Sequence, residues 1–208
     1  LQSSPNQFIK VIPNGVDTNF FLPHQKKTQK NTITIISTGR LIERKGYRYL
    51  IEALKDLPNI RLQLVGDGNL SKPLKELSEK CKVSVEFLGI RNRTEVAKLL
   101  SSADLFVLPS LNEGMSNSLL EAMSCGLPAI VTNVGGTIEL VQKDKNGFVV
   151  PKADAFALRA VIKKYISNPN LLNLHGLESR QKALNMSIEE NARQYIELYH
   201  SASLSPSI

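Results

Sequence analysis

Two carboxylates eight residues apart, Glu113 and Glu121, give the clearest indication of chemistry in this sequence. Between them, Ser116 and Asn117 are residue types that cap helix N-termini, and an apolar helical pattern follows. A helix N-terminus exposes unpaired N–H groups and the positive end of the helix dipole, which favour a phosphate or diphosphate. Eight helical residues rise about 12 Å, so the carboxylates can flank an anion and each bind hydroxyl groups. A sugar, a diphosphate and a ribose have this layout, although the spacing also fits two ordinary surface acids.

Basic residues gather directly after the first apolar run, which covers residues 33–37. Arg40 follows this run, and Lys45 and Gly46 precede the next helical pattern. Arginine suits bidentate recognition of phosphate, and lysine supplies a compact point charge. The four basic residues around this turn also fit a solvated surface, so their types alone leave both interpretations open; they are Arg40, Arg44, Lys45 and Arg48.

Two glycine pairs indicate tight turns. Gly66 and Gly68 resemble the start of a dinucleotide fingerprint, but Ser71 stands in the place of the third glycine and the preceding strand is internal. We interpret this segment as a turn that approaches a ligand. Gly135-Gly136 fits either a backbone that approaches substrate or a plain turn.

Several enzyme classes lose support because their residue patterns are absent. The sequence has no GxSxG, Walker A, HExxH or DxD pattern, which argues against a serine hydrolase, a P-loop NTPase, a zincin and a DxD metal site. Cys81 and Cys125 lie far apart without a CxxC pair, so neither a disulfide scaffold nor a zinc site is indicated. No nucleophile is patterned beside any of the three histidines, which are His24, His175 and His200.

The composition is that of a globular domain with an excess of positive charge. The 208 residues include 42% hydrophobic residues, which is enough for a full core and excludes wholesale disorder. The net charge is +7, but there is no run of five basic residues and no Trp, so we expect no nucleic-acid partner. No apolar stretch approaches the roughly 20 residues that cross a bilayer.

The elements that must position these residues alternate between β-rich runs and helical patterns. Strands are predicted over 33–37, 61–65, 84–88, 104–108, 129–132 and 147–150, with helices over 47–57, 72–81, 94–101, 116–124 and 137–141. Three further helices are predicted over 153–167, 171–184 and 188–203. This alternation predicts a doubly wound α/β fold with a six-stranded, Rossmann-like parallel sheet. The turn residues Gly39, Gly66, Gly89 and Pro109 follow strands, at the sheet edge where such folds bind ligands.

Eight motifs together resemble the C-terminal, donor-binding domain of retaining GT-B-type glycosyltransferases, the "glycosyl transferases group 1" family. The motifs cover about two thirds of the chain in the order typical of the family. They are IPNGVD (12–17), GRLIERKG (39–46), LVGDG (64–68), FLG (87–89), ADLFVLPS (103–110), EGMSNSLLEAMSCGLP (113–128), VGG (134–136) and NGFVVP (146–151). The resemblance implies the second half of a GT-B fold and retaining transfer of a sugar from a nucleotide-diphosphate sugar, with a UDP-sugar as the expected donor.

The same resemblance implies a role for each matching residue. Glu113, Arg40 and Lys45 would form the catalytic set, with Glu113 facing the transferred sugar and the two cations holding the diphosphate. Glu121 would bind the ribose hydroxyls, and Ile90 and Arg91 would lie against the base. The remaining donor-site residues would be Gly39, Gly66, Gly114, Met115, Ser116, Asn117 and Ser118. Many members carry Phe-Pro or Phe-Gly where Met115-Ser116 stands, so the sugar preference of those members does not transfer. The resemblance further implies no metal and no cofactor.

The resemblance also divides the chain and implies partners. Residues 1–30 would be an interdomain linker and the segment leading into the domain, 31–185 the nucleotide-sugar-binding domain, and 186–208 a C-terminal helix and tail. We expect a fragment that binds nucleotide but is catalytically incomplete, because the N-terminal domain that binds a saccharide or lipid-linked acceptor is not part of it. A cytoplasmic location, peripheral contact with the inner face of a membrane and self-association are further expectations.

Two alternatives belong to other functional classes. A noncatalytic nucleotide-binding or protein-interaction module could keep the same fold, and loss of Glu113 or Lys45 would have supported it, but both are present. A nicotinamide oxidoreductase is disfavoured because the glycine fingerprint is incomplete and no acidic residue closes the strand before it.

Overall fold

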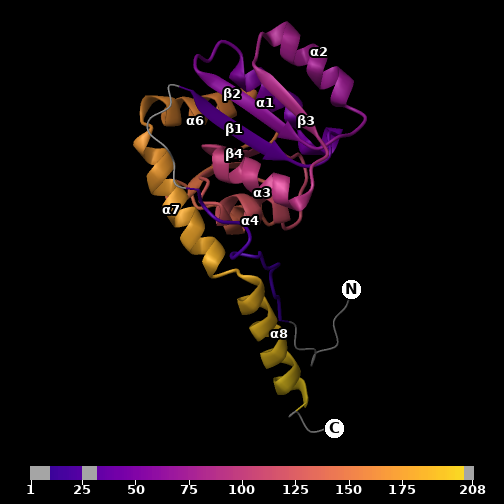
Figure 1. Ribbon diagram of the computed structural model, residues 1–208, viewed down its shortest axis with the longest axis vertical. Coiled ribbons are helices and arrows are strands. Elements are labelled where there is room, and N and C mark those ends of the chain that lie inside the picture. The colour runs from indigo at the N-terminus through magenta and orange to yellow at the C-terminus, as the bar shows by residue number, and fades with distance from the viewer. Residues whose placement is uncertain (1–9, 25–31, 204–208) are drawn as a thin grey trace.

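The computed structural model describes residues 10–24 and 32–203, and its centre is a six-stranded sheet (Figure 1). The strand order is β3-β2-β1-β4-β5-β6, and every neighbouring pair is parallel. The strands are β1 (Ile33–Thr38), β2 (Ile60–Val65), β3 (Val85–Gly89), β4 (Leu105–Leu108), β5 (Ala129–Thr132) and β6 (Gly147–Val150). All six predicted strands are therefore confirmed, with ends that differ by no more than one residue.

Helices cover both faces of this sheet, as the predicted doubly wound fold requires. Ile35 and Leu105 point into an apolar layer with the helices over 47–54, 71–81 and 155–167, whereas their neighbours Ile36 and Phe106 point into the opposite layer with the helices over 93–102, 117–124 and 137–140. The helices are η1 (Glu43–Lys45, a 3-10 helix), α1 (Tyr47–Leu54), α2 (Ser71–Cys81), α3 (Arg93–Ser102), α4 (Asn117–Ser124), α5 (Thr137–Leu140), α6 (Ala155–Ser167), α7 (Asn170–Leu184) and α8 (Ile188–Ser203).

Two helix ends differ from the prediction for local backbone reasons. Helix α1 stops at Leu54 rather than at residue 57, because Asp56 adopts a left-handed conformation with φ 58°. Helix α6 starts at Ala155 rather than at residue 153, because Ala153 also has a positive φ, of 58°, and Asp154 then caps the helix. Hydrophobic periodicity does not report such positive φ angles.

The segment before β1 packs into the domain. Val16 and Phe21 are buried in the same apolar layer as α4, and Val16 pairs with Ser187 between α7 and α8. The guanidinium of Arg180 donates to the carbonyl oxygens of Thr18 and Phe21, which fixes this segment against α7. Helix α8 extends away from the sheet with the N-terminal segment beside it (Figure 1). The predicted boundaries after residues 30 and 185 stay predictions, and residues 1–9, 25–31 and 204–208 lie outside the described part of the chain.

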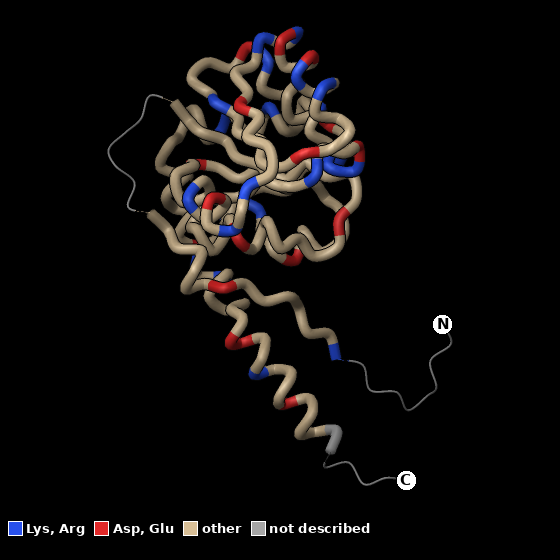
Figure 2. The backbone as a smooth tube through the Cα atoms, turned by 45° about the vertical axis from the view of Figure 1, so that its right-hand side comes forward, with Lys and Arg blue, Asp and Glu red and all other residues tan. Residues whose placement is uncertain are grey.

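Charged residues of both signs are spread along the backbone. In the view of Figure 2, Lys and Arg positions are interspersed with Asp and Glu positions over the sheet domain and along α8. Within the described residues, no helix is both long and apolar enough to pass through a membrane.

Candidate functional site

The candidate site lies at the carboxyl edge of the sheet, where the strand order reverses between β1 and β4. In this order the loops after β3, β2, β1 and β4 follow one another along a single edge. Gly39 and Arg40 follow β1, Gly66 follows β2, Ile90 follows β3 and Glu113 lies in the loop after β4. Ligands of open α/β sheets bind at such a reversal of strand order, so the topology brings the sequence-predicted residues to the expected place.

Close backbone contact between loops explains the Gly66 and Gly68 pair. A Cβ atom on Gly66 would lie 2.0 Å from the carbonyl oxygen of Gly39, and one on Gly68 would lie 2.4 Å from that of Leu41. Gly66 also has φ +133°, which residues with a side chain rarely adopt. The two glycines let the loop after β2 support the loop that carries Arg40.

The loop between β4 and α4 is held in the same way from its other side. A Cβ atom on Gly135 would lie 1.7 Å from the carbonyl oxygen of Glu113, and the Gly136 N–H donates to the Gly114 carbonyl at 3.2 Å. The structure gives Gly135-Gly136 a packing role beneath this loop, and the approach of its backbone to a substrate stays a prediction. The loop conformation around Glu113 is therefore fixed by backbone contacts on both sides.

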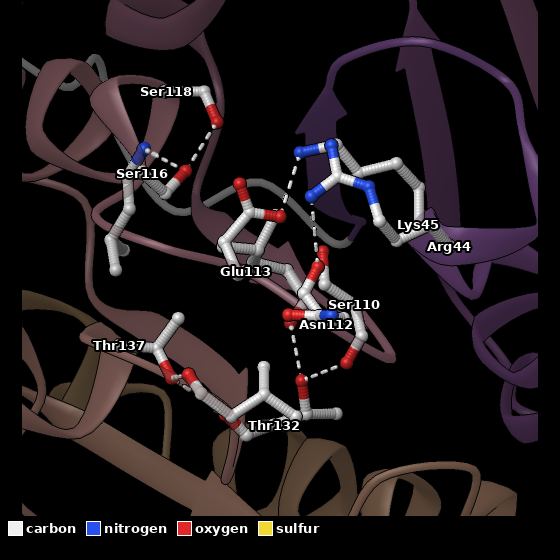
Figure 3. A network of polar contacts seen from close by, with 12 residues as sticks. Arg44, Lys45, Ser110, Asn112, Glu113, Ser116, Ser118, Thr132 and Thr137 are labelled. Carbon is white, nitrogen blue, oxygen red and sulfur yellow. Dashed lines mark hydrogen bonds and ion pairs between the residues drawn. The ribbon is translucent and has the colours of Figure 1, made fainter. Parts of the chain in front are cut away.

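Lys45 and Glu113 form an ion pair across the site (Figure 3). The Lys45 Nζ lies 3.0 Å from the Glu113 Oε2, and each side chain is only 10% exposed. Lys45 reaches this position from η1, which is tied to the β4–α4 loop because the Leu111 N–H donates to the Arg44 carbonyl and Arg44 Nη1 donates to the Asn112 carbonyl. The sequence predicts that both residues face a ligand, and the structure adds that they first face each other.

The N-terminus of α4 is capped and braced next to this pair. The Ser116 hydroxyl accepts from the Leu119 N–H and lies 3.0 Å from the Ser118 hydroxyl, which confirms Ser116 as the cap and makes Asn117 the first helical residue. Asn14 donates from Nδ2 to the Asn117 side-chain oxygen at 2.9 Å and from its backbone N–H to the Met115 sulfur. The first N–H groups of a helix have no partner within it, so this end of α4 offers donors to an anion.

The other sequence-predicted residues lie at the rim. Arg40 is exposed, and its side chain makes no hydrogen bond or ion pair with any residue that the structure describes. Ile90 is 78% exposed and Arg91 is also exposed, both just beyond β3. These three side chains are free to contact a ligand that extends from the Lys45–Glu113 pair toward β3.

Glu121 lies one turn into α4 and is half-buried. Burial raises the pKa of its carboxyl group, and the positive charge of Arg93 opposes this rise. Arg93 itself is held by an ion pair with Asp17 at 2.9 Å and by stacking over the Phe20 ring. Sequence reasoning gave no role to Arg93, which no motif marks.

Four buried hydroxyl groups were also missed by sequence reasoning. They belong to Ser37 and Thr38 at the end of β1, Tyr47 at the start of α1 and Ser110 after β4. None makes a hydrogen bond of normal geometry, although the Ser37 and Tyr47 hydroxyls lie close enough to interact. Burial strongly raises the pKa of Tyr47, a nearby Ser37 hydroxyl opposes this, and the negative charge of Glu113 adds to it. The phenol therefore stays protonated beside the ion pair.

Comparison with known proteins identifies the family. The sequence profile described as "Glycosyl transferases group 1" matches residues 19–194, which is most of the chain. The chain belongs to this family. One relative of known name is a UDP-Gal:alpha-D-GlcNAc-diphosphoundecaprenol alpha-1,3-galactosyltransferase of Escherichia coli, which is 34% identical over 196 residues, or 85% of this chain and 50% of the relative. Another is the phosphatidylinositol N-acetylglucosaminyltransferase gpi3 subunit of Schizosaccharomyces pombe, which is 33% identical over 168 residues, or 77% of this chain and 37% of the relative. The chain thus spans no more than about half the length of these relatives.

Solved structures agree with the group 1 assignment. Anabaena HepE in complex with UDP and glucose is 26% identical, with a TM-score of 0.82 over 92% of this chain and 56% of that one. Sucrose-phosphate synthase from Thermosynechococcus elongatus is also 26% identical, with a TM-score of 0.83 over 95% of this chain and 53% of that one. In this group 1 domain, Lys45, Glu113 and the start of α4 come together, while Arg40, Ile90 and Arg91 surround them. Their roles toward a ligand stay predictions.

Proposed function

We propose that this chain is the donor-binding domain of a glycosyltransferase that takes a sugar from a UDP-sugar. The observation that carries the proposal is the Lys45–Glu113 pair next to the N-terminus of α4, at the reversal of strand order. A cation, a carboxylate and free helical N–H groups in one place suit a sugar joined to a diphosphate. No other cluster in the described residues combines these three features beside a sheet edge.

The proposed roles are those that the resemblance to the family implies, and the positions of the groups are compatible with them. Lys45, Arg40 and the first N–H groups of α4 bind the diphosphate and stabilise its negative charge as it leaves the sugar. Glu113 faces the sugar, and Glu121 accepts hydrogen bonds from the ribose hydroxyls. Ile90 and its neighbour Arg91 contact the base from the rim. Because two basic side chains and the helix dipole neutralise the diphosphate, the proposal includes no metal ion.

The donor and acceptor classes draw support from the relatives. One is named for UDP-Gal and a diphosphoundecaprenol acceptor, one is an amylovoran biosynthesis glycosyltransferase from Erwinia amylovora, and HepE was solved with UDP and glucose. We extend this to the present chain as transfer, with retention, to a saccharide or lipid-linked acceptor that a partner domain holds. The net charge of +7 suits work at the anionic cytoplasmic face of a membrane.

Calorimetric titration of the chain with UDP, GDP and ADP tests the proposal. We expect saturable binding of UDP that weakens about tenfold or more in Lys45→Ala and Glu121→Ala, because each loses a charge-assisted contact. Lys163→Ala, an exposed substitution on α6, is the control and should bind as the unaltered chain does. Absence of binding by all three nucleotides would instead favour a noncatalytic interaction module on the same fold.

A further inference from the structure

Buried hydroxyl groups without partners concentrate at the candidate site. Among the described residues, five buried side-chain oxygen or nitrogen atoms lack a hydrogen-bond partner, and four of them are the hydroxyls of Ser37, Thr38, Tyr47 and Ser110. Leaving such a group unsatisfied costs free energy, so most buried polar groups in proteins are paired. Hydroxyls kept at this cost beside a ligand site indicate a use for them.

Tyr47 is the most informative of the four because the residue is only 2% exposed and its hydroxyl lies near the Lys45 ammonium. A Cβ atom built on Gly39 would lie 3.1 Å from the Tyr47 hydroxyl and 3.6 Å from the Lys45 Nζ. The phenol and the ammonium group therefore lie around the same point above Gly39. The phenol is also close enough to Glu113 to be influenced by its charge.

Donor binding creates a requirement that this hydroxyl can meet. A diphosphate that attracts the Lys45 ammonium leaves the Glu113 carboxylate, which is 10% exposed, without its counter-charge. An unpaired buried carboxylate is costly, and a neutral O–H donor lowers that cost without competing for the phosphate. A phenylalanine would fill the same space but could not donate.

We propose that Tyr47 is a positioning residue of the donor site, whose hydroxyl donates to Glu113, directly or through one internal water, when Lys45 binds the donor diphosphate. This inference rests on the proposed function of the site. It goes beyond that function because it assigns a role to a core-like aromatic residue that no motif marks. It predicts that removal of one oxygen atom affects diphosphate binding but not folding.

The test compares Tyr47→Phe with Tyr49→Phe, which makes the same change on the same helix. Tyr49 is half-exposed, and its ring stacks under Arg48. We expect Tyr47→Phe to keep or raise the urea midpoint, since it removes an orphan buried hydroxyl, and to weaken UDP binding about tenfold. Binding of UMP, which lacks the second phosphate, should not change. Tyr49→Phe should alter neither measurement. Unchanged UDP binding by Tyr47→Phe, or an equal loss for UDP and UMP together with lower stability, would overturn the inference.

A second measurement needs no nucleotide and separates this inference from the proposed function. If Tyr47 supports Glu113 when the Lys45 ammonium is absent, Lys45→Met should lower the free energy of unfolding more in a chain that carries Tyr47→Phe than in a chain that keeps Tyr47. Urea unfolding of the two single variants and the double variant gives this coupling. Simple additivity would overturn the role of Tyr47 even in a chain that binds UDP. Failure of the unaltered chain to bind any nucleotide would reject the proposed function, while the coupling would still decide whether Tyr47 supports Glu113.

Discussion

Glu113→Gln should destabilise the free domain and yet tighten its binding of UDP. The substitution keeps the size and shape of the side chain but removes its charge, so the Lys45 side chain, which is only 10% exposed, is left without a counter-charge. In the unaltered chain, a diphosphate must draw Lys45 from a carboxylate that lies 3.0 Å away. In the variant this competitor is absent, and the negative charge that repels the diphosphate is absent too. Because UDP lacks the sugar that would be transferred, lost contacts between Glu113 and that sugar do not affect the comparison.

The size of the destabilisation follows from the geometry of the pair. At 3.0 Å and an effective dielectric constant of about 20, the attraction is roughly 5 kcal/mol before desolvation is counted. Breaking a buried pair by removing one partner costs about 3 kcal/mol or more in measured cases. For a domain of this size, about 3 kcal/mol corresponds to a fall in Tm of roughly 6–12 °C.

The matched control is Glu52→Gln, because Glu52 pairs with Arg48 on the exposed surface of α1, with a separation of 3.5 Å. Exposed pairs contribute only about 0–1 kcal/mol, so the control should melt within a few degrees of the unaltered chain. Calorimetry should show UDP binding that is about fivefold tighter or more in Glu113→Gln, a gain of about 1 kcal/mol. A variant as stable as the unaltered chain, or one that binds UDP more weakly, would refute the competition that the ion pair implies.

Three other perturbations test the loops and the rim. Gly66→Ala should lower the free energy of unfolding by more than about 2 kcal/mol, because its Cβ would lie 2.0 Å from the Gly39 carbonyl oxygen. Gly89→Ala should lower it by about 1 kcal/mol, because Gly89 has φ +67° but no atom near the added Cβ. Equal losses for the two variants in urea unfolding would contradict this. Arg40→Ala should change stability by less than about 0.5 kcal/mol and weaken UDP binding about tenfold, and calorimetry showing unchanged affinity would exclude Arg40 from the site. Burial raises the pKa of Glu121 in the folded state above its ordinary value, so its charged form opposes folding at neutral pH and this cost disappears as the pH falls through the raised pKa. Glu121→Gln should therefore raise the free energy of unfolding at pH 7, and by a smaller amount in acid. The UDP affinity of the unaltered chain should fall when Glu121 becomes protonated, at a pH where exposed glutamates are still ionised.

The order of elements could be predicted because most strands are apolar runs and most helices have an apolar face. Parallel strands buried on both sides, such as residues 105–108 in β4, have this composition whatever their neighbours are. The order in which they pair could not be predicted, because it depends on contacts between residues far apart in the chain. β1 lies between β2 and β4, and only this placement creates the reversal at which the site forms.

The types of residue in the site could be predicted from the sequence, but the contacts between them could not. Motif spacing led to Lys45 and Glu113 separately, but their ion pair joins positions 68 residues apart. Gly66 is predicted to lie in a turn that approaches a ligand, which stays a prediction, and the structure adds that Gly66 packs against the loop after β1. Tyr47 occupies an apolar position of α1, so its pattern indicates a core residue, and only the structure reveals that its hydroxyl lies near the Lys45 ammonium.

These contacts change how affinity for the donor should be understood. In the free domain the two nearly buried charges neutralise each other, which lowers the cost of keeping either of them in place. Binding of a diphosphate is then an exchange of partners rather than the filling of an open cationic pocket. The measured affinity reports the difference between the new contacts of Lys45 and the old one, plus whatever supports Glu113 afterwards. Substitution of Lys45 and of Glu113 should therefore move UDP affinity in opposite directions, although both substitutions break the same ion pair.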